Sequence, residues 1–200
     1  PVLDYPQVIL KEHLFGVDLD PEAAEIAAVN LTMQAFADSR QKKLPLILNE
    51  NIKVGNSLIS GGEAELRPYF GDSWEQKHPF TWEREFSSIM DRGGLDVVIG
   101  NPPYLFGEQV DASAKRYFRE NFEVARGQYD EYWLFYEKCL QLLKPRGLHG
   151  YIIPDAILAR DEVEVVRKLL LEATRLRKIG HAIDAFGHGV SAVIIVFEKG

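Results

Sequence analysis

Cysteine, signal sequences and long apolar runs are all scarce or absent in this sequence. Cys139 is the single cysteine, so an internal disulfide is excluded. Its place in the apolar pattern of an expected helix is typical of a core thiol, because reactive cysteines need an electropositive, accessible setting. No run can span a membrane, and the first residues lack a basic-then-apolar signal pattern. We therefore expect a protein of the reducing cytoplasm with no membrane partner.

Positive charge is also limited. The chain has 23 Lys and Arg residues against 30 Asp and Glu, which gives a net charge of −7. This balance excludes a domain that binds polyanions over its whole surface. Basic residues do cluster in 115–126 and 167–178, where the ordinary interpretation is a solvated helix face. If nucleic acid binds, we expect many of the contacts to its phosphates to come from outside this chain.

Length and periodicity indicate one α/β domain of 200 residues. The pattern predicts an initial helix that ends near residue 12, strands at 13–17, 51–54, 95–100, 148–153, 178–185 and 192–198, and helices at 21–40, 81–90, 112–121, 130–144 and 162–173. Residues 60–80 are rich in glycine and proline and predict a surface loop. Strands that alternate with helices predict a doubly wound, mainly parallel sheet, with an antiparallel hairpin at its C-terminal end.

The most informative segment is Asn101-Pro102-Pro103-Tyr104, directly after the apolar strand 95–100. Each proline fixes its own φ and pushes the residue before it toward extended backbone, so the segment cannot enter a helix. The prolines lack N–H donors, so the backbone presents mainly carbonyl oxygen. An amide side chain, a backbone acceptor and an aromatic face together suit a planar group that carries –NH2. The alternative is an ordinary proline turn.

Two further candidates follow other strands, where doubly wound sheets bind their ligands. Asp18 stands where nucleotide-binding folds hold ribose hydroxyls with an acid, and Leu19 beside it can contact a purine. Asp20 is better explained as the cap of the next helix. Asn56 can accept from a purine amine, or it can simply form an Asx turn. No glycine-rich turn precedes the Asp18 strand, so we expect that residue 1 is not the natural start and that the first strand is missing.

Five segments occur in a recognisable order: 16–21, 55–58, 99–104, 150–154 and 186–192. In this order the chain resembles the gamma class of S-adenosylmethionine-dependent N6-adenine DNA methyltransferases, in particular the methylase–endonuclease polypeptides of type IIG restriction–modification systems. The resemblance covers nearly the whole chain. The Asn-Pro-Pro-Tyr motif also occurs in glutamine and rRNA methyltransferases, whereas the last two segments point to DNA adenine.

The resemblance implies a class I, Rossmann-like methyltransferase fold and S-adenosylmethionine as cofactor. Asp18 and Leu19 would hold the cofactor's ribose and purine, and Asn56 with Ser57 would contact its adenine amine. Many relatives carry Asp at the position of Asn56. Asn retains an acceptor oxygen there but lacks the charge.

The resemblance also implies that the catalytic residues are Asn101, Pro102, Pro103 and Tyr104. Asn101 and Pro102 would bind the target amine of a base rotated out of double-stranded DNA, and Tyr104 and Phe186 would lie on its two faces. A target-recognition domain, fused or separate, and a nuclease would be partners. The histidines lack ligand-like spacing, so we expect no metal.

Besides a type I modification subunit or a phage-defence methylase, which would keep the same chemistry, two alternatives stay open at this point. One is a methyltransferase that acts on protein glutamine or rRNA. The other is a non-catalytic fragment that binds DNA or a partner subunit.

Overall fold

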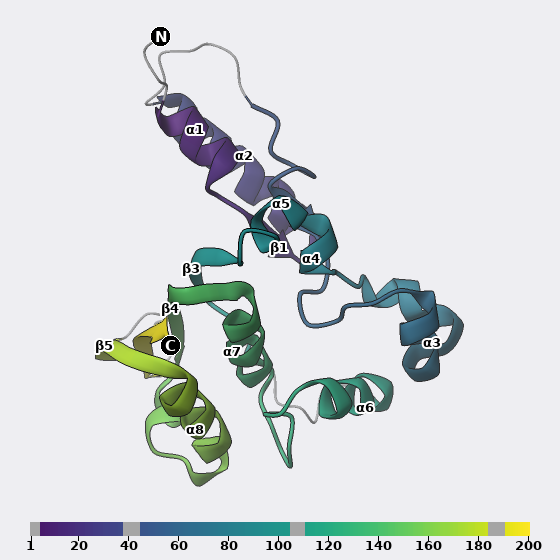
Figure 1. Ribbon diagram of the computed structural model, residues 1–200, viewed down its shortest axis with the longest axis vertical. Helices are drawn as coiled ribbons and strands as arrows, with labels where there is room; N and C mark the ends of the chain where they lie inside the picture. The colour runs from purple at the N-terminus through teal and green to yellow at the C-terminus, as the bar shows by residue number, and fades with distance from the viewer. Residues whose placement is uncertain (1–4, 38–44, 105–110, 184–190) are drawn as a thin grey trace. The chain divides into compact units, whose positions relative to one another are not determined.

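The computed structural model describes residues 5–37, 45–104, 111–183 and 191–200. The chain divides into two compact units. Figure 1 labels helices and strands of both. The first unit contains residues 1–67 and 72–81, and the second contains residues 68–71 and 82–200. No helix in the described ranges is long and apolar enough to cross a membrane.

The first unit packs two helices on a small parallel sheet. Its elements are α1 (Tyr5–Glu12), β1 (Gly16–Asp18), α2 (Pro21–Ala37) and β2 (Ile52–Val54). The core contains Leu10 of α1, Ala24 and Ala28 of α2, and Ile52 of β2. Strands β1 and β2 run parallel, and the Gly55 N–H donates to the Asp18 carbonyl at 2.8 Å. The carboxyl ends of both strands therefore lie at one edge of this sheet.

The expected surface loop at 60–80 is wrong. The structure has helix α3 (Glu63–Phe70) followed by the 3₁₀ helix η1 (Gly71–Lys77). The Glu65 carboxylate accepts the Gly62 N–H at 2.8 Å, and Glu63 pairs with Arg67 one turn later at 3.0 Å. Acidic side chains in the first turn favour a helix start. Pro68 lies in the last turn of this short helix, where it removes only one backbone hydrogen bond. The many glycine and proline residues in 60–80 therefore indicate a loop although a helix forms.

The second unit has a four-stranded mixed sheet. Its elements in chain order are α4 (Trp82–Glu85), α5 (Ser87–Met90), β3 (Leu95–Gly100), α6 (Ala112–Asn121), α7 (Glu131–Leu142), β4 (Leu143–Pro154), η3 (Asp155–Leu158), η4 (Asp161–Val163), α8 (Glu164–Ala173), β5 (Thr174–Ile183) and β6 (Ala192–Lys199). The strand order is β3-β4-β6-β5. β3 and β4 are parallel, whereas β6 is antiparallel to both β4 and β5. The α/β class and the antiparallel C-terminal hairpin are confirmed.

The bounds expected from the sequence agree only in part with those observed, because β4 begins at Leu143 rather than at 148, and β5 begins at Thr174 rather than at 178. β3 and α6 match the expected ranges. The helix expected at 81–90 is instead two short ones, and the Thr81 hydroxyl accepts the Gly61 N–H at 3.2 Å. The side chain of Asp130, at the start of α7, makes no capping hydrogen bond. The backbone carbonyl of Asp130 accepts the Trp133 N–H at 3.0 Å.

One face of the second unit's sheet is closed by aromatic packing against α7. The inward residues are His149, Tyr151 and Ile153 of β4 and Val193, Ile195 and Phe197 of β6, all buried. Tyr136 of α7 meets His149 and Phe197 with ring centroids 4.9 and 6.4 Å apart. On the other face, Val97 and Ile99 of β3 are 53% and 81% exposed.

Cys139 lies inside this packing, as expected for a core thiol. It is 4% exposed, and its Sγ lies 2.5 Å from the Tyr151 hydroxyl. Burial raises the pKa of the Cys139 thiol to about 12. At neutral pH the group is therefore a neutral thiol, which is a poor nucleophile.

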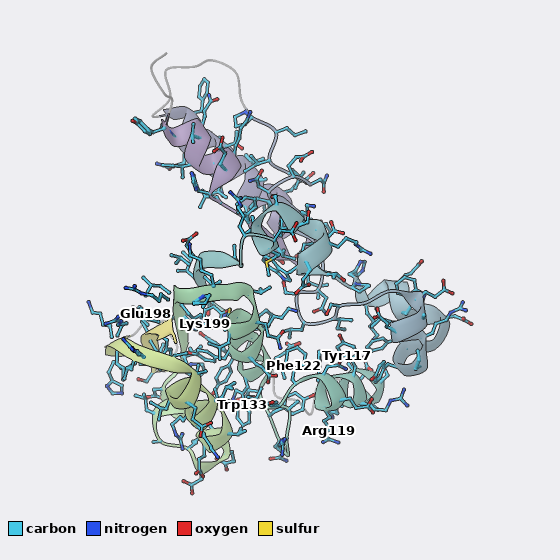
Figure 2. The ribbon with its side chains drawn as sticks, in the orientation of Figure 1. Tyr117, Arg119, Phe122, Trp133, Glu198 and Lys199 are labelled. Atoms are coloured by element: carbon cyan, nitrogen blue, oxygen red, sulfur yellow. The ribbon has the colours of Figure 1, made fainter. Side chains whose placement is uncertain are left out.

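Figure 2 shows another aromatic residue of α7, Trp133, together with Tyr117 of α6 and Phe122 just after it.

His149 predicts how stability depends on pH. Burial lowers its pKa from 6.5 to about 4, and its Nε2 has no hydrogen-bond partner in the described part of the chain. The unfolded chain therefore binds a proton more readily than the native state between pH 6.5 and 4. We expect this residue to cost the protein about 3 kcal/mol of stability as pH falls through that window.

The measurement is urea unfolding of the protein and of His149→Phe at pH 7 and pH 4.5. The variant should lose clearly less stability on acidification, because Phe cannot take up the proton. His13→Gln, which changes an exposed histidine, is the control and should behave like the parent. An identical acid loss in His149→Phe would contradict the assignment.

Candidate functional site

The Asn-Pro-Pro-Tyr segment leaves the sheet at the carboxyl end of β3. Gly100, the last residue of β3, pairs with Tyr151 of the parallel strand β4. A Cβ on Gly100 would lie 3.0 Å from the Tyr151 ring, so that ring packs against the strand end. Pro102 is buried and Pro103 exposed, and the segment continues without helix or strand, as the two prolines predict.

The Tyr104 hydroxyl holds the segment to the neighbouring strand. Its oxygen lies 2.7 Å from the Asn101 Oδ1 and 2.8 Å from the Ile152 carbonyl of β4. The single hydroxyl hydrogen can serve only one of these acceptors at a time. Partial burial raises the pKa of Tyr104, so the hydroxyl remains a donor at neutral pH. Asn101 itself is exposed, and its amide is therefore both oriented and accessible.

The Tyr104 ring is only partly covered. It meets Tyr132 of α7 edge-on, with centroids 6.3 Å apart and planes at 89°. Tyr132 is 1% exposed, and burial raises the pKa of its hydroxyl to about 12. The ring is thus held from one side. Sequence reasoning gave no role to Tyr132 or to the Ile152 carbonyl, because the first resembles any core aromatic and the second has no side-chain signal.

The carboxylate of Asp18 lies at the end of β1. Its Oδ1 accepts the Asp20 N–H at 2.9 Å, and the side chain is exposed. Asp20 in turn accepts the Glu22 N–H at 2.9 Å, which confirms it as the cap of α2. Leu19 is 52% exposed and offers an apolar surface next to the carboxylate.

Asn56 follows β2 and forms the Asx turn that was its alternative interpretation. Its Oδ1 accepts the Leu58 N–H at 3.0 Å, and its own N–H donates to the His78 carbonyl at 2.6 Å. An amide oxygen has two lone pairs, so one acceptor position remains for a ligand. Ser57 next to it is partly buried. The proposed roles of Asn56 and Ser57 stay predictions.

The candidates are thus divided between the two units. Asp18 and Asn56 share the carboxyl edge of the first unit's sheet, and residues 101–104 lie at the carboxyl end of β3 in the second. Phe186 lies outside the described residues. Within the ranges that the structure describes, no group of His, Cys, Asp or Glu residues could hold a metal ion.

Gly55 provides a test of the local geometry next to Asn56. A Cβ at this position would lie 2.6 Å from Phe80 Cδ2 and 2.8 Å from Phe80 Cβ. We expect Gly55→Ala to lower the free energy of unfolding by about 1–3 kcal/mol, because the buried ring must move. Gly62→Ala is the matched control, since a Cβ there meets nothing within 4 Å. Urea unfolding measures both, and equal stability of the two variants would contradict the packing.

The fold is that of the class I S-adenosylmethionine-dependent methyltransferases. A Listeria monocytogenes protein assigned to this class matches 98% of this chain with a TM-score of 0.50 and 17% identity, over 58% of its own length. The DNA-bound type ISP restriction-modification enzyme LlaBIII matches 96% of this chain with a TM-score of 0.68 and 14% identity, over 14% of its own length. At these identities the likeness establishes the fold alone.

The chain belongs to the Eco57I restriction-modification methylase family, whose profile matches residues 12–186. The type II restriction enzyme and methyltransferase RM.Eco57I of Escherichia coli is 29% identical over 181 residues, or 86% of this chain. The adenine-specific methyltransferase PglX of Streptomyces coelicolor is 26% identical over 207 residues, or 92% of this chain. The resemblance drawn from the motifs is confirmed. The chain spans 17% of the length of each of these two relatives.

Proposed function

We propose that the whole protein transfers a methyl group from S-adenosylmethionine to the N6 of adenine in double-stranded DNA, within a restriction–modification system. The observation that carries this proposal is the Asn-Pro-Pro-Tyr segment at the end of β3, where Tyr104 orients the exposed amide of Asn101. Family membership and the names of RM.Eco57I and PglX support DNA adenine over protein glutamine or rRNA as the substrate.

The chemistry requires acceptors for an amine. The N6 lone pair of adenine is delocalised into the ring, which makes it a poor nucleophile. Two oxygens, the Asn101 Oδ1 and the Pro102 carbonyl, can each accept one N6 hydrogen. Such contacts favour a more pyramidal nitrogen and stabilise the positive charge that develops on it. Because Pro102 and Pro103 stiffen the backbone, these acceptors need little reorganisation.

Tyr104 can free the Asn101 oxygen without losing a hydrogen bond. Its hydroxyl has a second acceptor, the Ile152 carbonyl at 2.8 Å. When an amine approaches Asn101, the hydroxyl hydrogen turns fully to Ile152, and both lone pairs of the Asn101 Oδ1 become available. The contact with Tyr132 keeps the Tyr104 ring in place during this exchange.

The target base must leave the duplex to reach these acceptors. The partly exposed ring of Tyr104 offers a stacking surface, and base–aromatic stacking contributes about 1–3 kcal/mol per base. Phe186 stays our prediction for the other face of the base. Because the proposed substrate is DNA, we expect the whole protein to act in the cytoplasm, with a nuclease and a target-recognition domain as partners.

The residues of the first unit fit a nucleoside cofactor in part. Asp18 has an exposed carboxylate with one oxygen already fixed by the Asp20 N–H, so its second oxygen can accept from ribose hydroxyls. Leu19 supplies apolar surface for a purine, and Asn56 with Ser57 would meet the purine amine. When bound, S-adenosylmethionine would supply the methyl group that is transferred.

Asn101→Ala tests the proposal. In the whole protein, we expect this variant to lose methyl transfer to duplex DNA by about 10²-fold or more, because an acceptor for the developing charge is gone. Binding of S-adenosylmethionine, measured by calorimetry, should be unchanged. Asn30→Ala, which changes an exposed asparagine of α2, is the matched control and should retain activity.

Tyr104→Phe separates orientation from stacking. This variant keeps the ring and loses the hydroxyl, so extrusion of the base, followed by 2-aminopurine fluorescence, should persist while turnover falls.

Equal loss of cofactor binding and methyl transfer in Asn101→Ala would overturn the role given to that residue. Methylation of release factor or rRNA in preference to DNA would overturn the substrate.

A further inference from the structure

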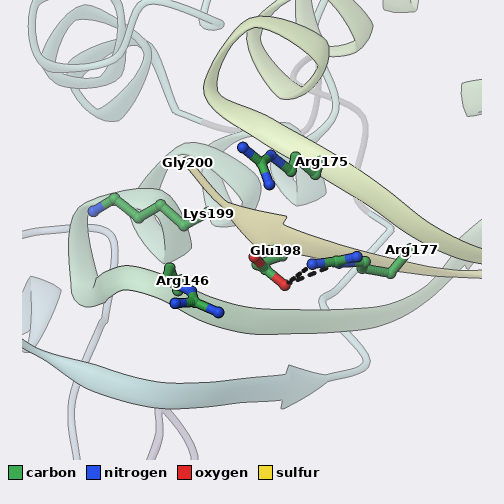
Figure 3. Close-up of a pocket in the computed structure, with 6 residues that line it drawn as sticks. All are labelled: Arg146, Arg175, Arg177, Glu198, Lys199 and Gly200. Atoms are coloured by element: carbon green, nitrogen blue, oxygen red, sulfur yellow. Dashed lines mark hydrogen bonds and ion pairs between the residues drawn. The ribbon is translucent and has the colours of Figure 1, made fainter.

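A basic pocket of about 390 Å³ lies at the edge of the second unit's sheet where β4 and β5 begin and β6 ends (Figure 3). Its lining residues are Arg146, Arg175, Arg177, Glu198, Lys199 and Gly200. The pocket thus combines four cationic side chains with one carboxylate. This is a concentrated positive charge in a chain whose net charge is −7.

The single carboxylate of the pocket is already engaged. Both Nε and one terminal nitrogen of Arg177 bond to the same oxygen of Glu198, and the dashed lines in Figure 3 mark these contacts. Arg175 stands directly opposite Glu198 in the pairing of β5 with β6. The irregularity between Leu176 and Lys178 brings Arg177 to Glu198 instead. Arg175 is therefore left without an acidic partner in the described part of the chain.

Arg146 is in the same situation. It enters the pocket from the first residues of β4, and its φ of 65° lies in the left-handed region that a non-glycine side chain rarely adopts. Across residues 5–37, 45–104, 111–183 and 191–200, no carboxylate pairs with Arg146. Two guanidinium groups thus face one pocket without neutralisation, and their repulsion favours the binding of an anion.

Hydrogen bonds to backbone carbonyls hold Lys199 and Gly200, two of the lining residues, in place. The Lys199 Nζ donates to the carbonyls of Leu140 and Leu143 at 2.6 Å each, which joins the end of β6 to the end of α7. The Gly200 N–H donates to the Ala173 carbonyl at 2.9 Å and joins it to the end of α8. The charge of Lys199 is directed at helix carbonyls, so Arg146 and Arg175 are the groups available to a ligand.

The pocket is separate from the Asn-Pro-Pro-Tyr segment. Both contact β4, but Arg146 lies near its start and the Ile152 carbonyl, which meets Tyr104, lies near its end. The regular part of β4 from Leu148 to Ile152 spans about 13 Å at about 3.3 Å per residue, and Arg146 lies before it. A ligand in the pocket therefore does not occupy the proposed place of the target amine.

We propose that this pocket binds a phosphate group through Arg146 and Arg175. Arginine forks match the oxygens of phosphate and hold it with charge-assisted hydrogen bonds. The volume exceeds that of one phosphate, so the group can be free phosphate or part of a nucleic-acid backbone. The inference does not depend on the proposed methyl transfer.

The experiment compares the whole protein with the double variant Arg146→Asn/Arg175→Gln. Asn is chosen at 146 because it tolerates left-handed backbone. Inorganic phosphate is titrated at constant ionic strength, and the thermal unfolding midpoint is followed. The midpoint of the parent should rise with phosphate and saturate, and the apparent affinity of the double variant should fall at least about tenfold, since two charge-assisted contacts are lost. Arg84→Gln/Lys168→Gln removes two exposed charges outside the pocket and should respond like the parent.

A second arm identifies the source of the phosphate. Binding of a labelled DNA duplex is measured against salt concentration. If the pocket holds the DNA backbone, the double variant binds more weakly and the slope of log affinity against log salt falls by about two. If the duplex binds both proteins equally while the phosphate response is lost, the ligand is free phosphate.

Three results would overturn the proposal. These are an absent phosphate response in the parent, an equal response in the double variant, and a response to acetate as large as that to phosphate. Turnover of DNA by the double variant is a separate readout, so failure here is distinguishable from failure of the proposed methyl transfer.

Discussion

The hydroxyl of Tyr104 is the contact on which the candidate site depends. It lies within hydrogen-bond distance of both the Asn101 side chain and the Ile152 carbonyl, so it joins the segment after β3 to the neighbouring strand. The diproline stiffens the backbone but does not by itself orient the Asn101 amide. The partial burial of Tyr104 keeps its hydroxyl protonated, and Tyr132 holds its ring. Stiff backbone, oriented amide and aromatic ring therefore form one assembly.

Much of this assembly could be predicted from the sequence. The β-branched run 95–100 and the two prolines define the end of β3 through local sterics alone, and the structure has the same bounds. Asp20 was predicted as a cap for the same reason, because capping depends on the next few residues. The sequence therefore predicts the features that depend only on a residue and its neighbours in the chain.

The rest depends on contacts between distant residues. The Ile152 carbonyl meets Tyr104 only because β3 and β4 pair in one register, which no local pattern states. The sequence does not predict the helix at 63–70, because glycine and proline are plain in the sequence and indicate a loop. The hydrogen bond from the Gly62 N–H to the Glu65 carboxylate, which stabilises the first turn, is seen only in the structure. The pairing of Glu198 with Arg177 rather than Arg175 follows from an irregularity in β5. The sequence shows the basic cluster 167–178 but favours a helix face for it, whereas Arg175 and Arg177 lie on β5 and line the pocket.

The central claim is that the end of β3 presents two fixed oxygen acceptors to the exocyclic amine of a base. The most direct measurement is a structure of the whole protein on duplex DNA with the target adenine rotated out. The account predicts that the adenine N6 lies within hydrogen-bond distance of both the Asn101 Oδ1 and the Pro102 carbonyl, with the Tyr104 hydroxyl on Ile152. An adenine whose N6 contacts neither oxygen would contradict it.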